Sequence, residues 1–453
     1  SIHWTWQAAP TGEDAKYGKA AMSLNNFCIS ANGMEDKSCL PCHPGWGTST
    51  ESGINCLNCH SRKKVNWDEA VGDLAAFIEA GDEESLEIAA EIQAELQEAA
   101  QDIGRPNRQN CGGCHFIGGG GDGVKHGDLD TSLTKPSKAL DVHMGVDGQN
   151  FDCVRCHTTE MHNIAGRVYT RPAATDRKSL IEDDLTPKIT CESCHSATPH
   201  AAGSKANDHT DRVACQTCHI PEVARELPTK MTWDWSQAGK LKDGKPYKTE
   251  DEFGKHDYLT IKGAFKWAKN VTPEYFWYNG VIKSVTAQDM IDPGQVVPVS
   301  APVGSPEDAD SRIYPFKVHR GKQPYDKVNK TLLVPLLSGD DGYWKTLDWQ
   351  RALSTGQASV GLPYSGQFDF VETSYVFPAT HMVAPKEKAL ACNDCHTRQG
   401  SRLANVAGVY MPGRDRFDLL NTFGWVAVVG ALFGVTFHGL GRVFTSGRNG
   451  KRR

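Results

Sequence analysis

The sequence predicts a mainly α-helical fold with extensive coil, organised around repeated cysteine motifs rather than a large apolar core, and followed by one membrane-spanning helix. Three observations predict this fold. The motif Cys-x-x-Cys-His occurs seven times in the 453 residues. Hydrophobic residues make up only 39% of the chain, whereas glycine and proline, which favour loops, number 44 and 23. Residues 419–440 contain no Asp, Glu, Lys or Arg.

The repeated motif indicates covalent c-type haem. Two thiols three residues apart reach the two vinyl groups of one porphyrin, and the histidine after the second thiol ligates the iron. Zinc shared by two Cys-x-x-Cys pairs is the alternative, but zinc needs no histidine after every second cysteine. The predicted attachment residues are Cys39, Cys42, Cys56, Cys59, Cys111, Cys114, Cys153, Cys156, Cys191, Cys194, Cys215, Cys218, Cys392 and Cys395. The predicted proximal iron ligands are His43, His60, His115, His157, His195, His219 and His396.

Seven haems account for the unusual composition. Each haem brings a large apolar face, so the predicted fold is a multihaem c-type cytochrome packed around covalent haems. The formal net charge is −6 and each haem adds two propionates, so the charge balance does not favour nucleic acid as a partner. Because covalent haem attachment takes place outside the bacterial cytoplasm, we expect a periplasmic globular part. No signal peptide is visible in the sequence.

The motifs and the composition divide the chain into three regions. Residues 1–230 are expected to form a multihaem core with six motifs, into which a helical hairpin at 67–103 is inserted. Residues 231–418 are rich in aromatic residues, contain segments typical of short strands, and carry the last motif; we expect them to wrap the core. Residues 419–453 are expected to form a membrane anchor and its tail.

The hairpin at 67–103 is predicted from its periodicity. Leucine and isoleucine recur near helical spacing, Gly81-Asp82 breaks the run, and Gly104-Arg105-Pro106 ends it. Its many acidic residues are interpreted as a solvated face rather than as a docking site.

The uncharged stretch at 419–440 is long enough to cross a membrane, because a helix rises about 1.5 Å per residue and the hydrocarbon core is roughly 30 Å thick. A buried core helix is the alternative. A basic tail follows, and the positive-inside rule places this tail in the cytoplasm. The expected location is therefore the periplasmic side of a bacterial inner membrane. The tail contains Arg442, Arg448, Lys451, Arg452 and Arg453.

His438 lies inside the predicted membrane helix, near its cytoplasmic end. Ionisable residues within membrane helices are candidates for function. Two interpretations stay open: ligation of a b-type haem (heme b) shared with a membrane partner, and an ordinary interfacial histidine.

The remaining histidines are sufficient for a second ligand on most irons. Seven of the 17 histidines are proximal, which leaves ten, and low-spin electron-transfer haems commonly use two histidines. The count does not reveal which haem, if any, is ligated differently. The residues assigned as distal ligands, with their pairing left open, are His3, His143, His162, His200, His209 and His381. Of the 15 cysteines, the motifs use fourteen and leave Cys28, which is either a small buried hydrophobe or a reactive thiol.

Several segments together resemble one family, the octahaem c-type cytochromes of the tetrathionate reductase family. The resemblance covers most of residues 1–412 but extends poorly to the hairpin at 67–103. It rests on Ser1-Ile2-His3-Trp4-Thr5-Trp6, on the glycine-rich Asp122-Gly123-Val124-Lys125-His126 segment within 111–128, and on residues 26–29, 140–144, 214–221, 318–326 and 381–386.

The resemblance implies eight haems and a particular catalytic haem. The family's first motif lies upstream of the segment at 1–6, so the motif Cys39–His43 corresponds to its second haem. That haem is catalytic in the family and has a lysine as distal iron ligand, for which Lys125 is the best match. Cys28 matches a cysteine beside the same haem, and Asp122 and His126 complete the implied catalytic group.

The resemblance also implies a membrane-anchored periplasmic reductase. Electrons would come from the quinol pool through a quinol-oxidising or b-type cytochrome membrane subunit, with periplasmic electron carriers as further partners. The substrate would be a small anion: tetrathionate, whose sulfur–sulfur bond is cleaved by two electrons to give two thiosulfates, or a nitrogen oxide such as nitrite, with hydroxylamine as a related substrate. The alternative is a non-catalytic electron-transfer conduit, which the haem motifs alone would fit equally well.

The first prediction concerns haem number. We expect the purified intact protein to carry eight covalent haems, seven of them on the motifs named above, because the family's first motif precedes the segment at 1–6. Intact-mass measurement of the native polypeptide checks this number. A native N-terminus at Ser1 together with seven haems would refute it.

Overall fold

The computed structural model describes residues 56–63, 65, 67–118, 121–160, 163–166 and 189–449. The chain forms two compact units, Ser1–Ala389 and Leu390–Arg453, and each is described by itself. The division of the chain at residues 230 and 418 stays a prediction from composition.

The described cysteine motifs form single helical turns. Within such a turn, residues three and four apart lie on one face, so both thiols and the histidine are presented to the same side. In the first unit these turns are α1 (Cys56–His60), the end of α4 (Arg108–His115), α5 (Cys153–Cys156), α7 (Glu192–His195) and α8 (Cys215–His219).

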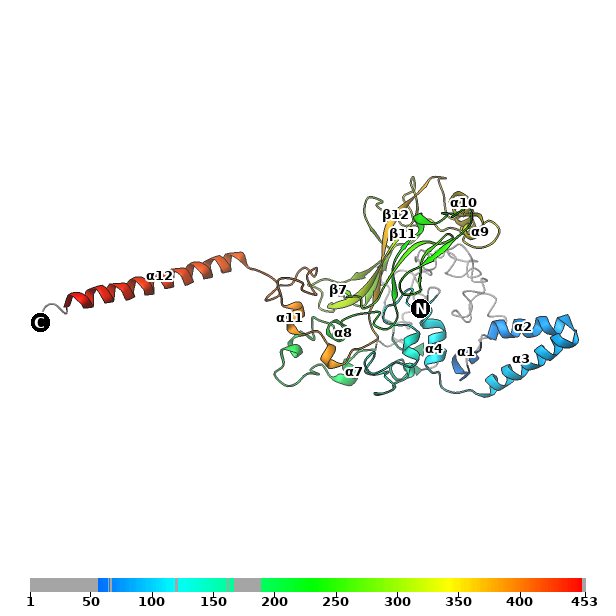
Figure 1. The fold of residues 1–453 in the computed structure, drawn as a ribbon, viewed down its shortest axis with the longest axis horizontal. Coiled ribbons are helices and arrows are strands. Elements are labelled where there is room, and N and C mark those ends of the chain that lie inside the picture. The colour runs from blue at the N-terminus through cyan, green and yellow to red at the C-terminus, as the bar shows by residue number, and fades with distance from the viewer. Residues whose placement is uncertain are drawn as a thin grey trace. The chain divides into compact units, whose positions relative to one another are not determined.

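Two antiparallel helices follow the first described motif (Figure 1), as the periodicity predicts. They are α2 (Trp67–Ala80) and α3 (Glu83–Gln101). The turn at Gly81-Asp82 separates them because Gly81 adopts a positive φ of 71° and Asp82 caps α3, accepting from the Ser85 N–H at 2.9 Å. The hairpin returns the chain to its starting point, where Ser61 forms a β-bridge with Ile103.

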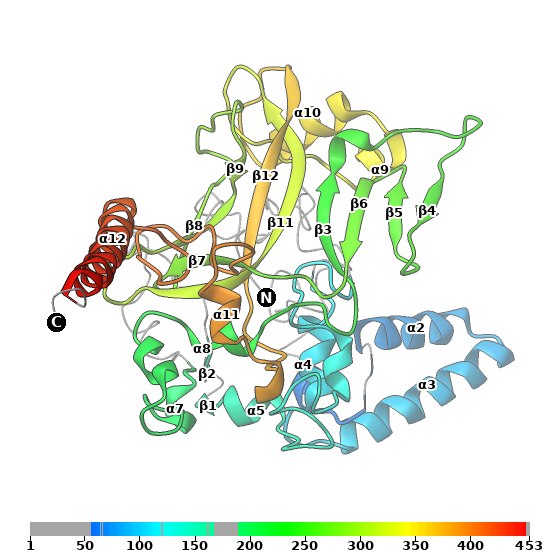
Figure 2. The ribbon, with the colours of Figure 1, turned by 60° about the vertical axis from the view of Figure 1, so that its left-hand side comes forward.

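A large sheet fills the region between residues 229 and 378. In the described part of the chain it has eight strands in the order β4-β5-β6-β3-β11-β12-β9, and β7 also pairs with β11. The strands β3, β6, β5 and β4 follow one another on one side of the long antiparallel pair β11–β12 (Figure 2). Their bounds are β3 Thr229–Asp234, β4 Lys248–Glu250, β5 His256–Leu259, β6 Gly263–Ala268, β7 Glu274–Tyr278, β9 Val297–Pro298, β11 Arg312–Asp326 and β12 Phe368–Pro378.

The remaining described elements of this unit are short. Three of the helices flank the sheet or end a loop: η8 (Trp235–Gln237), α9 (Tyr343–Thr346) and α10 (Trp349–Ser359). The others are η6 (Thr131–Thr134), η7 (Lys205–His209), η9 (Lys386–Lys388) and the strand pairs β1 (Thr159–Glu160) with β2 (Asn163–Ile164) and β8 (Val281–Ser284) with β10 (Ser300–Val303).

The sheet corrects the expectation of a mainly α fold. The part of the chain that the structure describes has 33% helix and 19% strand, so its fold is mixed. The aromatic-rich residues that sequence reasoning assigned to short strands build the eight-stranded sheet and a separate two-stranded sheet of β8 and β10. The physical reason is that aromatic and β-branched side chains fit a pleated surface, and here they pack into a common core.

That core is aromatic. The indole rings of Trp233 and Trp235 lie 4.7 Å apart between centroids, and the Tyr343 ring stacks on Trp349 at 4.0 Å. These rings form one buried cluster with Phe377 and neighbouring aliphatic side chains. The cluster anchors β11 and β12, and thereby fixes the strand ends that approach the haem motifs.

The second unit contains the last motif and a long apolar helix. The motif helix is α11 (Cys392–Cys395). The guanidinium of Arg414 stabilises the loop after it by donating to the carbonyls of Leu403, Val406 and Val409 at 2.7–2.8 Å. The helix α12 (Asp418–Asn449) is continuous. Its segment Asp418–Thr445 is long and apolar enough to cross a membrane, and its apolar side chains are exposed.

The second prediction concerns α12. A chain truncated after Phe417 should be a soluble haem protein, because it lacks the exposed apolar side chains that favour transfer into lipid. A control chain ending at Thr445 keeps the helix and should stay with the membranes. Membrane fractionation followed by haem staining measures the distribution. Sedimentation of the shorter chain with membranes would contradict the anchor.

Candidate functional site

Three pairs of histidine rings face one another in the described residues. Each pair joins a motif histidine to a histidine from a distant segment: His157 to His381, His219 to His200, and His195 to His143. The ring centroids lie 6.2, 6.0 and 6.0 Å apart, respectively. His143, His200 and His381 are three of the histidines assigned as distal ligands.

This separation fits an iron atom between the two rings. A metal–imidazole bond is about 2.0 Å long, and the ligating nitrogen lies about 1.1 Å from the ring centroid, so two ligands on opposite sides place the centroids about 6.2 Å apart. All three pairs meet this requirement, although their interplanar angles of 27°, 10° and 62° differ. Rotation about the bond to the metal changes that angle without changing the separation.

Hydrogen bonds to the backbone hold several of the rings in the orientation that ligation needs. The Nδ1 atoms of His60, His157 and His396 lie 2.9, 2.8 and 2.7 Å from the carbonyl oxygens of Gly104, Ala165 and Pro412. An Nδ1–H that donates to a carbonyl leaves Nε2 as the ligating atom. Burial also lowers the pKa of His115 to about 3 and lowers those of His157 and His219, which favours the neutral, metal-binding form.

Successive motifs of the first unit lie next to one another. The thiols of Cys111 and Cys153 are hydrogen-bonded to each other, and so are those of Cys191 and Cys215. The hydrogen bond to Cys153, burial, and the charges of Cys153 and Cys59 all raise the pKa of Cys111. In a haem-attached protein these sulfur atoms are thioethers, so their closeness reports the distance between attachment points.

Polar side chains tie these neighbouring motifs together. The amide of Asn110 in α4 donates to the carbonyls of Asn58 and Ser61 at 3.3 and 2.6 Å, which joins α4 to α1. The buried guanidinium of Arg108 donates to the Phe151 carbonyl at 2.8 Å and pairs with Asp152 at 3.4 Å, directly before the next motif. The motifs at 56–60, 111–115 and 153–157 therefore lie next to one another in the same order as in the sequence.

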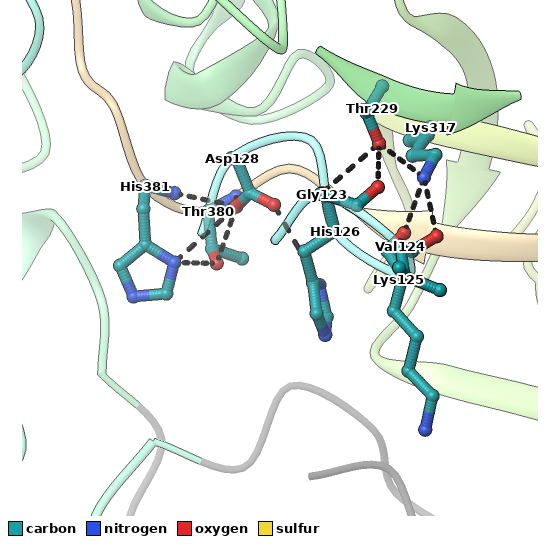
Figure 3. A network of polar contacts seen from close by, with 9 residues as sticks. All are labelled: Gly123, Val124, Lys125, His126, Asp128, Thr229, Lys317, Thr380 and His381. Atoms are coloured by element: carbon teal, nitrogen blue, oxygen red, sulfur yellow. Dashed lines mark hydrogen bonds and ion pairs between the residues drawn. The ribbon is translucent and has the colours of Figure 1, made fainter. Parts of the chain in front are cut away.

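A glycine-rich loop presents Lys125. Gly123 has a φ of 67°, and a Cβ there would lie 2.2 Å from the Pro228 carbonyl oxygen, so only glycine fits this turn. The side chains of Lys125 and His126 leave the loop on the side opposite Thr229 and Lys317 (Figure 3), and the His126 ring packs edge-on against Phe377 of β12, with 5.4 Å between centroids. Lys125 is 6% exposed, and its ammonium makes no hydrogen bond or ion pair with any described residue.

A second buried lysine clamps this loop from the sheet. The Nζ of Lys317 in β11 donates to the Lys125 carbonyl at 2.7 Å, to the Val124 carbonyl at 3.3 Å and to the Thr229 hydroxyl at 2.5 Å. Thr229 in turn donates to the Gly123 carbonyl at 2.7 Å. Burial, with a smaller effect of Lys230, holds the pKa of Lys317 well below its ordinary value, while Asp128 acts in the opposite direction.

The carboxylate of Asp128 lies between two histidines (Figure 3). Its Oδ1 is 3.8 Å from Nδ1 of His126, and its Oδ2 is 3.4 Å from Nδ1 of His381. Burial lowers the pKa of His126 despite the opposing charge of Asp128. Burial opposes protonation of His381 too, but the hydrogen bond and charge of Asp128 outweigh it and raise the pKa of His381.

Comparison with known proteins places this arrangement in a family. The family model for bacterial cytochrome c matches residues 230–399. The crystal structure of octahaem cytochrome c from Shewanella oneidensis matches with 37% sequence identity and a TM-score of 0.68. The match covers 90% of this chain and 87% of that protein. No curated protein matches the chain.

The chain belongs to the multihaem c-type cytochromes. Its cofactor is haem c, and its function is redox chemistry or electron transfer. The three histidine pairs fit this cofactor. Of the other assigned ligands, His60, His115, His209 and His396 lie outside these pairs, and Nδ1 of His209 contacts the Lys205 carbonyl at 2.8 Å.

Part of the predicted site of this cytochrome lies outside the described residues. These residues are His3, Cys28, Cys39, Cys42, His43 and His162. Asp122 is described, and both of its carboxylate oxygens are engaged, because they accept from the N–H and hydroxyl of Thr131 at 2.8 and 2.7 Å. Asp122 thus stabilises the loop that carries Lys125.

Sequence reasoning missed the residues that support the loop. Asp128 was visible as the second residue after His126, but nothing in a linear sequence shows that it meets His381. Lys317 and Thr229 carry no motif at all. Position 317 carries little signal of its own, because Lys317 is one of two lysines among the mixed polar and apolar residues of β11.

The third prediction concerns the clamp. Lys317→Met should lower the free energy of unfolding by about 1–3 kcal/mol, because the Val124 and Lys125 carbonyls would stay buried without their donor. Thermal or denaturant unfolding of the haem-loaded protein measures the change. The matched control is Lys327→Met, which removes an exposed lysine just beyond the same strand and should change stability by less than about 0.5 kcal/mol. Equal stability of both variants would contradict the clamp.

Proposed function

We propose that this multihaem cytochrome is a membrane-anchored periplasmic reductase. It takes electrons from the quinol pool and delivers them to a small sulfur oxyanion such as tetrathionate, or to a nitrogen compound such as nitrite or hydroxylamine. The reaction takes place at a haem whose distal ligand is Lys125. The resemblance noted in the sequence suggests this activity, and several features of the described residues support it.

The series of adjacent motifs supports electron delivery. The thiol contacts between Cys111 and Cys153 and between Cys191 and Cys215 bring attachment points together. The motifs of Cys156 and Cys194 are also neighbours, because burial and the charge of Cys194 raise the pKa of Cys156. Five motifs between residues 56 and 219 thus follow one another in the order of the sequence. Haems attached at these neighbouring motifs would be placed to exchange electrons, and iron held by two histidines would change its geometry little on reduction.

The observation that carries the proposal is the state of Lys125. Burying an amine costs several kcal/mol unless it gains a partner, and a buried lysine normally pairs with a carboxylate. The described residues supply no such partner, yet the loop is fixed by Gly123, Thr229 and Lys317. A neutral lysine amine is a good iron ligand, and coordination supplies the missing interaction.

The residues of the loop have distinct roles in the proposed reaction. The haem supplies iron-centred electron transfer when bound. Lys125 would hold the iron of the bound haem as a neutral amine; once displaced by substrate it would take up a proton from solvent, and the resulting ammonium would stabilise the negative charge of the substrate. His126, kept neutral by burial, can donate a hydrogen bond to the same anion. Cys28, as a thiolate, would hold a sulfane sulfur of tetrathionate or attack it; attack would break the central S–S bond and release one thiosulfate, and two electrons from the haems would then cleave the resulting cysteine–thiosulfate S–S bond, releasing the second thiosulfate and restoring the thiolate.

The helix α12 supports a membrane location. With the basic residues after it on the cytoplasmic side, the haem-bearing part lies in the periplasm. A quinol-oxidising or b-type cytochrome subunit is the proposed membrane partner, and His438 is a candidate for contact with it. Periplasmic electron carriers are the proposed soluble partners.

A non-catalytic conduit is the second candidate. The three histidine pairs favour it, because each provides two strong ligands and no open position for a substrate. A conduit, however, gives no role to the buried amine of Lys125.

The fourth prediction tests the lysine. Lys125→Leu should lower turnover of tetrathionate, nitrite or hydroxylamine by about tenfold or more, since about 1.4 kcal/mol of transition-state stabilisation corresponds to a factor of ten. Electron paramagnetic resonance of the oxidised protein should lose the signal of one lysine-ligated haem and retain the histidine-ligated ones. Reduced-donor turnover assays with the three substrates measure the activity.

Two further variants sharpen this test. Lys135→Leu removes an exposed lysine near the loop and should change neither turnover nor spectrum. Cys28→Ala should reduce tetrathionate turnover more than hydroxylamine turnover, because only sulfur chemistry uses a thiolate. A wild-type spectrum in which every haem has two histidines would refute the reductase and favour the conduit.

A further inference from the structure

Asp128 is tied to one proposed iron ligand by several hydrogen bonds. It is 2% exposed, and its Oδ2 accepts from the backbone N–H groups of Thr380 and His381 at 2.7 and 3.0 Å. The Thr380 hydroxyl lies 3.3 Å from the same oxygen and 2.9 Å from Nδ1 of His381. The carboxylate therefore acts on the His381 ring both directly, at 3.4 Å, and through the Thr380 hydroxyl.

This arrangement differs from that of the other rings. The Nδ1 atoms of His60, His157 and His396 contact neutral backbone carbonyls. His143 also lies near a carboxylate, but the Asp141 oxygen is 3.9 Å from its Nδ1 and accepts from backbone N–H groups instead. Among the described ring contacts, that of His381 is the one in which a buried anion comes within 3.5 Å of Nδ1.

A carboxylate at Nδ1 changes the metal on the other side of the ring. It withdraws the Nδ1 proton toward itself, which increases the electron density that Nε2 donates to iron. A more basic ligand stabilises the ferric state, which carries one more positive charge than the ferrous state. The reduction potential of such a haem is consequently lower.

We propose that Asp128, with Thr380, lowers the reduction potential of the haem held between His157 and His381. The inference rests on the proposed two-histidine ligation of that haem and is independent of the substrate. Asp128 is a positioning residue in this role, since it acts through His381 and does not contact iron.

The place of Asp128 gives this haem a special relation to the lysine loop. Its second oxygen faces His126, the residue next to Lys125. One buried carboxylate thus borders both the electron-carrying pair His157–His381 and the loop proposed to meet substrate. A low potential at this haem keeps electrons poised to leave it for a more oxidising neighbour.

The fifth prediction tests this role in the full-length, haem-loaded protein. Asp128→Asn keeps an oxygen for the backbone N–H groups but removes the charge, so the midpoint potential of one low-spin haem should rise while the others stay unchanged. Thr380→Val removes the hydroxyl and should raise the potential of the same haem by a smaller amount. Redox titration monitored by visible absorption and electron paramagnetic resonance resolves the individual haems.

Two controls separate this role from a structural one. Asp326→Asn removes another buried carboxylate that caps a turn beyond β11, and it should leave every potential unchanged. His381→Ala should convert one haem to high spin; if it does not, the ligation assignment itself fails. If Asp128→Asn displaces His381 and gives a high-spin signal, the midpoint potential measured for Thr380→Val decides whether the proposal holds. Unchanged potentials in low-spin Thr380→Val, or in low-spin Asp128→Asn, would overturn the proposal, whatever the substrate turnover.

Discussion

Two axial ligands must reach each iron from opposite sides, and this requirement determines how distant parts of the chain meet. The motif supplies one histidine locally, within a single helical turn. For His157, His195 and His219 a second histidine comes from another segment, and its ring lies 6.0–6.2 Å from the first. That distance leaves little freedom, because ligand bonds tolerate only small changes in length. The loops that carry His143, His200 and His381 must therefore be held as firmly as core elements.

Hydrogen-bonded side chains provide this rigidity in place of a large apolar core. Arg225, for example, donates to the carbonyls of Ala139, Leu140 and Met382, and so joins the loops that present His143 and His381. Arg108 and Asn110 do the same for neighbouring motifs. Each such donor satisfies buried carbonyls that coil cannot satisfy within itself. The low apolar content of the sequence is thus compatible with order, because cofactor surface and polar ties together replace aliphatic packing.

Sequence reasoning succeeded where a pattern is local. The haem-attachment motifs, the α2–α3 hairpin and the apolar helix α12 each depend on residues a few positions apart. It did not foresee the large sheet, because β11 carries buried Lys317, His319 and Gln323 among its apolar residues and therefore lacks a simple alternation. It also left the distal pairing open. Asp128 and His381 are separated by 253 positions, and no spacing rule connects them.

The buried amines of this region bear on the choice between the two proposed functions, a reductase and an electron-transfer conduit. Lys317 and Lys125 both lie where water is largely excluded, and burial holds the pKa of Lys317 well below its ordinary value because burying its charged form is unfavourable. Lys317 recovers the cost through three acceptors, and its hydrogen bonds fix the backbone at Lys125. An electron conduit has no use for a fixed, buried lysine, since two histidines are sufficient to hold the iron. A ligand that can leave the metal and then carry positive charge is useful only where an anion takes its place. The combination of a fixed loop and an amine with no acid partner among the described residues therefore supports the proposed reaction at this position rather than electron transfer alone.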